Sequence, residues 1–255
     1  KLNYTLTNVI IVLVQVIYGE EFVNKFIFDV DGTLTPSRGE IDTEFRIFFN
    51  TFCRLNDVYL VTGSDKPKTV EQITEKTYNL CKRVYNCSGC DVWEGETHIR
   101  SDKWKIPLHV KSWLEDKLEE SSFPLRTGLH IEERSGMVNF SVVGRNASLY
   151  ERKQYADFDK QVGERNIIAD LFNKEFSKLI ARPGGETGID ISPKGADKSQ
   201  IVNDFNPNDV LHFYGDRMDT MGNDYPLKKV IIDNDLGFAI AVDGWKDTWS
   251  KLKCI

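Results

Sequence analysis

The chain is poor in the residues that mark several large classes of protein. It has 33 Lys and Arg against 39 Asp and Glu, a net charge of −6 and no basic tract. This balance argues against nucleic acid as a partner, because nucleic-acid binding depends on clustered positive charge. A small anionic substrate can still bind if arginines are gathered locally.

Cysteine and histidine are also scarce. The five cysteines do not form the kind of disulfide framework that is typical of secreted proteins, and only Cys87 and Cys90 have CxxC spacing. A single CxxC without a second pair does not favour zinc, and the four histidines show no metal-ligand spacing. We therefore expect reduced thiols, as in a cytosolic protein.

The apolar run at residues 9–18 is well short of the roughly 20 residues that cross a bilayer, so no membrane partner is expected. Its length suits a signal-peptide core that ends at Gly19, and Asn3 and Asn146 begin glycosylation triplets. An extra strand or a wrongly assigned start is the favoured alternative. Residues 1–24 are therefore an N-terminal extension of unknown role, and the cytoplasm is the expected location.

The two outer parts of the chain alternate strands with helices. A helix is predicted over residues 42–55, where the apolar residues have helical spacing. Strands are predicted at residues 26–28, 58–61, 210–214, 230–232 and 238–241. This alternation predicts an α/β fold with a parallel sheet.

The pattern changes in the middle of the chain. Residues 110–118 and 159–179 have the periodicity of amphipathic helices, and residues 129–143 between them have the character of strands. At 255 residues the chain can form a core domain plus a cap. We expect a core at 25–93 and 194–255, with an inserted α+β cap at 94–193.

An acidic loop, Asp29-Val30-Asp31-Gly32-Thr33, follows the first predicted strand. Both of its carboxylates reach the crevice where open α/β sheets bind ligands. Asp29 can attack a phosphoryl group, and Asp31 can move the proton that the attacked or departing oxygen needs. Gly32 permits a sharp turn and Thr33 offers a hydroxyl. A plain Asp-Gly turn is the alternative, but the preceding strand and the Thr-Leu-Thr after it favour catalysis.

Further polar residues follow the other predicted strands. Thr62 stands at the end of the second strand, where its hydroxyl can contact a phosphate. Asp216 and Asp224 complete an acidic cluster with the two loop carboxylates, so the predicted cation ligands are Asp29, Asp31, Asp216 and Asp224. Oxygen ligands and phosphate chemistry point to Mg²⁺. Lys198 supplies a positive charge to the transferred phosphoryl group.

The acidic loop resembles the nucleophile loop of the haloacid dehalogenase (HAD) superfamily, and residues 29–38 are similar to the opening of eukaryotic-type phosphomannomutases. Other segments share that family's sequence and spacing: residues 133–141, Gly144-Arg145, Glu151-Arg152, residues 189–198, and Gly215-Asp216 with residues 222–224. The resemblance implies a Rossmann-like HAD core with a parallel sheet and an inserted α+β cap.

The resemblance also implies an activity. Members interconvert mannose 6-phosphate and mannose 1-phosphate through a phospho-aspartate, with a hexose 1,6-bisphosphate as activator, for GDP-mannose synthesis. It implies a cytosolic homodimer joined through the caps. The residues that match the family's substrate pocket are Arg38, Arg134, Arg145, Arg152, Gly188 and Asp190.

Two departures from the family pattern leave alternatives open. Gly188 stands where the family has a serine that helps to hold the phosphate, and Val230 stands where it has an acidic ligand of a second cation. One alternative is a HAD sugar-phosphate phosphatase, which uses the same nucleophile but transfers the phosphoryl group to water instead of a sugar hydroxyl. A non-catalytic phosphosugar-binding protein is a second alternative, although the intact acidic residues argue against it.

Overall fold

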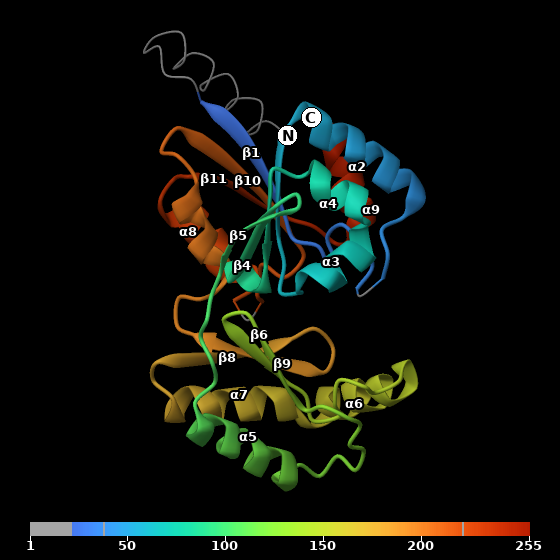
Figure 1. Ribbon diagram of the computed structural model, residues 1–255. Helices are drawn as coiled ribbons and strands as arrows, with labels where there is room; N and C mark the ends of the chain where they lie inside the picture. Colours follow the sequence, from blue (N-terminus) through green and yellow to red (C-terminus); the bar gives the residue numbers. More distant parts are fainter. Residues whose placement is uncertain (1–21, 38, 221) are drawn as a thin grey trace.

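The core of the computed structural model, which describes residues 22–37, 39–220 and 222–255, is a seven-stranded sheet (Figure 1). Its order is β11-β10-β1-β2-β3-β4-β5. The strands are β1 Val23–Phe28, β2 Asp57–Val61, β3 Arg83–Asn86, β4 Asp91–Glu94, β5 Thr97–Ser101, β10 Asp209–Gly215 and β11 Gly237–Ala241. The pairs from β11 to β3 are parallel, and β4 and β5 are antiparallel additions.

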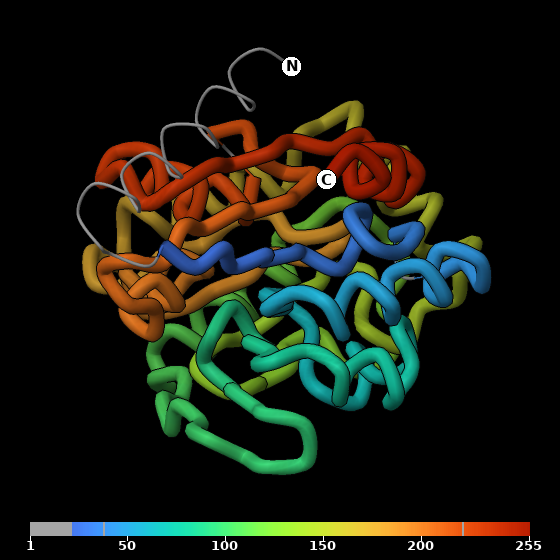
Figure 2. Tube along the Cα trace, turned by 90° about the horizontal axis from the view of Figure 1, so that it is seen from above, coloured from blue at the N-terminus to red at the C-terminus, as the bar shows by residue number. Residues whose placement is uncertain are grey.

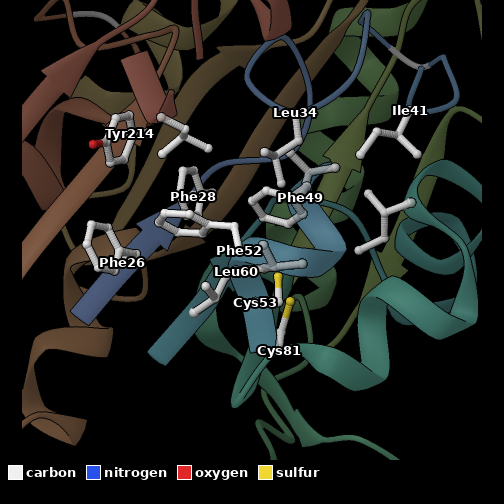
Figure 3. Packing of buried hydrophobic residues seen from close by; sticks show 14 of the residues in the cluster. Phe26, Phe28, Leu34, Ile41, Phe49, Phe52, Cys53, Leu60, Cys81 and Tyr214 are labelled. Atoms are coloured by element: carbon white, nitrogen blue, oxygen red, sulfur yellow. The ribbon is translucent and has the colours of Figure 1, made fainter. Parts of the chain in front are cut away.

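Strand β1 lies in the interior of this sheet. It pairs with β10 on one side and β2 on the other, so the C-terminal part of the chain returns beside the first strand (Figure 2). Phe26 and Phe28 point to one face, where they pack with Phe49 and Phe52 (Figure 3), and Ile27 points to the other. Burial on both faces explains why this strand is a continuous apolar run.

Helices cover both faces of the core sheet (Figure 1). One face carries α2 Thr43–Leu55, α3 Lys66–Ile73, α4 Glu75–Leu80 and α9 Trp245–Leu252, and the other carries α8 Tyr225–Asp233 with the 3₁₀ turn Lys198–Asp204. Helix α2 confirms the prediction for residues 42–55. The Asp42 side chain begins it by accepting hydrogen bonds from the backbone N–H groups of Glu44 and Phe45.

A second, antiparallel sheet has the order β6-β7-β9-β8. Its elements are β6 Ile131–Arg134, β7 Met137–Phe140, β8 Leu179–Gly184 and β9 Gly188–Pro193, with α5 Leu108–Glu120, α6 Leu149–Val162 and α7 Glu164–Glu175. The three helices cover one face of this sheet, and its other face is turned toward the core (Figure 1). We call these elements the cap; their uncovered sheet face lies opposite the carboxyl edge of the core.

Three sequence predictions differ from the structure. The single helix over 159–179 is wrong, because Gly163 takes a left-handed conformation (φ 70°) that ends α6, and α7 ends at Glu175. The strand over 230–232 is wrong, because this segment lies in α8, which buries Leu227 and Ile231 on one helical face. The boundary at residue 94 also differs, because β5 pairs with β4 in the core sheet.

The prediction for the N-terminal extension falls on residues 1–21, which lie outside the described residues, while Val23 and Asn24 begin β1. Within the described ranges, none of the helices combines the length and the apolar character that a membrane crossing requires.

His212 of β10 gives the core a dependence on pH. Its ring stacks between Phe26 (4.9 Å) and Phe238 (5.2 Å), and burial lowers its pKa to about 4. Its ordinary pKa is about 6.5, so below that pH the unfolded chain binds a proton that the folded chain does not. The free energy of unfolding should therefore fall by about 2 kcal/mol on this account between pH 7 and pH 5.

Urea unfolding of His212→Gln at the two pH values tests this expectation. Between pH 7 and pH 5, the free energy of unfolding of the variant should fall by about 2 kcal/mol less than that of the wild type. His109→Gln is the control, because His109 is exposed on α5. Parallel losses in the wild type and His212→Gln would contradict the prediction.

Candidate active site

A cavity of about 430 Å³ separates the carboxyl edge of the core sheet from the cap. From the core it is lined by Asp29, Asp31, Ser37, Thr62, Gly63, Ser64, Asp65, Lys68, Asp216, Arg217 and Asn223. From the cap it is lined by Glu132, Arg134, Asn139, Arg145, Pro183, Gly184, Gly185 and Asp190. Ligands of open α/β sheets bind at this edge, so the cavity is the candidate active site.

The loop after β1 is held in a tight turn around one carbonyl oxygen. The backbone N–H groups of residues 33, 34 and 35 all donate to the Val30 carbonyl, at 3.2, 2.9 and 3.1 Å. Gly32 has a φ of 79°, and a Cβ there would lie 2.3 Å from Asp216 Oδ2. Glycine is therefore needed both for the backbone conformation and for the close approach of Asp216.

Three carboxylates meet beside this loop. Asp29, Asp216 and Asp224 each offer an oxygen within 4.8 Å of the others. Lys198 is fully buried between two of them, with Nζ 2.5 Å from Asp29 Oδ1 and 2.7 Å from Asp224 Oδ1. Three carboxylates and one ammonium leave a net negative charge, which favours a hard cation.

Burial dominates the electrostatics of the cluster. It raises the pKa of Asp29 well above its ordinary value, against the opposing charge of Lys198. It also raises the pKa of Asp216 to about 6, and the charge of Asp224 adds to this effect. For Lys198, burial lowers the pKa but the charges of Asp224 and Asp29 outweigh it, so the amine stays protonated. The donor set and its excess of negative charge fit Mg²⁺.

The fourth predicted carboxylate has a different position. The Asp31 side chain lines the cavity and accepts a hydrogen bond from Gln72 Nε2 at 2.8 Å. Among the described residues it does not belong to the group of three carboxylates. This position suits proton transfer to a bound substrate, as predicted for this residue. Thr62 is buried at the cavity wall, where its Oγ1 accepts from the Ser64 N–H at 3.1 Å.

Two of the predicted arginines line the cap side of the cavity. Arg134 on β6 is mostly buried and donates from Nη1 to the Gly63 carbonyl of the core at 3.2 Å. Arg145 donates to Asn139 Oδ1 at 3.2 Å, and Asn139 in turn donates to Asp190 Oδ1 at 2.6 Å. Asn139 and Asp190 are direct partners across β7 and β9, which explains their contact.

Two further predicted pocket residues, Arg152 and Gly188, are not among the residues that line the cavity, whereas Asp190 is. Arg152 is buried on α6 and donates from Nη2 to Thr187 Oγ1 at 2.8 Å. Gly188 is buried, and a Cβ there would lie 2.5 Å from Asn139 Nδ2, so Asn139 occupies the space of the missing side chain. Arg38 lies outside the described residues.

Several charged or polar lining residues were not predicted from the sequence, among them Lys68, Glu132, Asn139 and Arg217. Glu132 stands two residues before Arg134 on the same strand, so strand alternation places both side chains on one face. That alternation is the signal that could have found it. Lys68 lies in the first turn of helix α3, shortly after the Thr62 loop, where its backbone N–H donates to the Asp65 side chain.

The fold and the carboxylate site together define a HAD-type protein. The structure resembles the C-terminal domain of C. albicans trehalose-6-phosphate phosphatase, with a TM-score of 0.62, 15% identity and 95% of each chain covered. It also resembles a haloacid dehalogenase-like hydrolase from Bacteroides thetaiotaomicron, with a TM-score of 0.56, 13% identity, and 91% of this chain and 99% of that chain covered. At these identities the likeness concerns the fold alone.

Sequence comparison identifies the family more closely. The model of the eukaryotic phosphomannomutase family matches residues 46–255. The chain is 31% identical to the phosphomannomutase of Spinacia oleracea over 79% of this chain and 84% of that protein. It is 30% identical to that of Saccharomyces cerevisiae over 82% and 87%. The chain belongs to the eukaryotic phosphomannomutase family, an enzyme family.

Proposed function

We propose that this enzyme interconverts mannose 6-phosphate and mannose 1-phosphate through a phosphorylated Asp29. The observation that supports this most strongly is the cavity itself, which has the Asp29 carboxylate on one wall and two arginines, Arg134 and Arg145, on the opposite wall. A phosphosugar that binds in either orientation needs one phosphate at the nucleophile and a second site for the other end. Guanidinium groups suit the second site, because they bind phosphate bidentately.

The residues divide the chemistry between them. Asp29 attacks the phosphoryl group, and Asp31 gives a proton to the departing sugar oxygen and later takes one from the accepting hydroxyl. Lys198 is held beside Asp29, where its charge can stabilise the transferred group. Mg²⁺, held by Asp29, Asp216 and Asp224 with Asp31 as the remaining predicted ligand, would offset phosphate charge. Thr62 offers a hydroxyl to a phosphate oxygen.

A hexose 1,6-bisphosphate primes the enzyme and is the intermediate that turns over within the site. Its second phosphate is held by Arg134 and Arg145, which line the cavity. Arg38 is a further candidate from the family resemblance, while Arg152 and Gly188, which that resemblance also names, lie behind the cavity wall. Asp190 lines the cavity and can orient the hydroxyl groups of the sugar ring. Cap closure must keep water from phospho-Asp29, because water as acceptor gives hydrolysis instead of transfer.

We further propose a cytosolic homodimer, joined through the caps, that supplies mannose 1-phosphate for GDP-mannose synthesis, as the family resemblance implies. Two large side chains at the start of α6, Leu149 and Tyr150, are 85% and 71% exposed, which supports a contact surface on the cap. Light scattering at micromolar concentration tests this point, and a monomeric mass would exclude the dimer.

The reaction is tested with one labelled substrate. We expect mannose 1-phosphate labelled in the sugar to yield mannose 6-phosphate when Mg²⁺ and a hexose 1,6-bisphosphate are added, and neither isomer exchange nor phosphate release after chelation. If only free mannose and phosphate accumulate, the enzyme is a phosphatase. If the sugar binds but no bond breaks under any of these conditions, the protein is a binding protein.

A further inference from the structure

Glu132 joins the two cavity arginines through one oxygen atom. Its Oε2 accepts from Arg134 Nε at 2.9 Å and from Arg134 Nη2. The same oxygen lies 3.0 Å from Arg145 Nε. Glu132 itself lines the cavity, and β6, which carries it, lies at the junction with the core (Figure 1). The sequence resemblance assigned this residue no role.

The other contacts of the two arginines determine how many of their N–H groups remain available to a ligand. Arg134 has five N–H bonds, of which two are used by Glu132 and one by the Gly63 carbonyl. Arg145 uses one N–H at Asn139, and its buried Nε forms an ion pair with Glu132 Oε2 without a hydrogen bond. Both arginines therefore keep terminal N–H groups that can bind an anion in the cavity.

Glu132 also offsets the repulsion between the two arginines. Burial lowers the pKa of Arg145, the charge of Arg134 lowers it further, and Glu132 opposes both effects. Without this carboxylate, the two partly buried guanidinium groups would repel each other with less negative charge nearby to offset the repulsion. Each would also regain rotamers that the shared oxygen removes.

We propose that Glu132 is a positioning residue, which holds Arg134 and Arg145 side by side so that their free N–H groups receive the second phosphate of a hexose bisphosphate. The inference rests on the proposed function, because it assigns that phosphate to this pocket. The proposal predicts that replacing Glu132 weakens binding of the bisphosphate, although Glu132 itself carries a negative charge. Its loss makes the pocket more positive, which by itself would tighten anion binding, but the orientation of two bidentate donors is lost at the same time.

The test compares Glu132→Gln and Glu132→Asp with the control Glu133→Gln. Glu133 is the next residue on β6, so it points to the other face of the strand, where it lies 3.6 Å from Lys105. Glu132→Asp keeps the charge but shortens the side chain. Both Glu132 variants should raise the KM for hexose 1,6-bisphosphate by at least about 10-fold, the scale of one lost charge-assisted hydrogen bond. Glu133→Gln should stay within about 2-fold.

Two further measurements separate positioning from a general structural effect. The rise in KM should be at least about 10-fold larger for the bisphosphate than for p-nitrophenyl phosphate, which brings no second phosphate to the cap. Combined with Arg145→Ala, Glu132→Gln should cost clearly less than the product of the two single effects, because it acts through that arginine.

The outcomes distinguish this inference from the proposed function. A lower or unchanged KM in both Glu132 variants, or costs that multiply in the double variant, overturns the positioning role. An unchanged KM in Arg145→Ala overturns the pocket and the positioning role together. A wild type that hydrolyses the bisphosphate without exchanging isomers overturns the mutase alone, since its KM still reports on the cap pocket.

Discussion

Replacement of Asp29 by asparagine should abolish turnover, with a loss of at least about 10⁴-fold in kcat. An amide cannot form the acyl phosphate, and the other carboxylates of the cluster cannot replace it. Asp224 is fully buried and bound by Lys198, and Asp216 lies against Gly32. The measurement is isomer exchange in the presence of Mg²⁺ and bisphosphate, together with mass spectrometry of the acid-quenched enzyme for a phosphorylated aspartate.

The fold of Asp29→Asn should be preserved. Burial raises the pKa of Asp29 against the opposing charge of Lys198, so a neutral amide removes the desolvation cost of the carboxylate and gives up its ion pair with Lys198, two effects that offset each other. Lys198 keeps its contact with Asp224. We expect the free energy of unfolding to change by less than about 2 kcal/mol. Asp233→Asn, on the exposed end of α8, is the control for turnover. A phosphorylated enzyme in Asp29→Asn would remove Asp29 as the nucleophile.

The core half of the site could be predicted from the sequence because its geometry is fixed by the sheet. Asp29, Thr62 and Asp216 each follow a parallel strand, and the carboxyl ends of neighbouring parallel strands meet at one edge. The buried strands gave strong signals because they are apolar on both faces. The segment at residues 230–232 gave the same signal from a helix, since a short apolar run fits either element.

The cap half could be predicted only in part. The family resemblance implied roles for Arg134, Arg145 and Arg152, but it does not show on which side of the cap sheet each side chain lies. Arg152 belongs to α6, and the structure holds its guanidinium at Thr187 within the cap. Asn139 fills the space beside Gly188 only because β7 and β9 are paired in one register. Such contacts depend on cross-strand pairing, which one sequence does not reveal.

Replacement of Asp31 by asparagine should slow the transfer steps by about 10² to 10⁴-fold, the usual contribution of general acid–base catalysis. The local structure should persist, because an asparagine Oδ1 can still accept the hydrogen bond that Gln72 Nε2 donates to Asp31 at 2.8 Å. The three-carboxylate group does not include Asp31, so a bound cation should keep most of its ligands. The expected defect is thus in proton transfer and not in folding.

Substrates with different leaving groups distinguish proton transfer by Asp31 from a role in supporting the nucleophile or the cation. A sugar oxygen must be protonated as it departs, whereas p-nitrophenolate leaves without a proton, so only the first substrate depends on an acid. Asp31→Asn should therefore form phospho-Asp29 from p-nitrophenyl phosphate at close to the wild-type rate, and from hexose 1,6-bisphosphate about 10² to 10⁴-fold more slowly. Rapid acid quench after mixing gives both rates. Equal losses with the two substrates would show that Asp31 supports the nucleophile or the cation, and not the proton transfer assigned to it here.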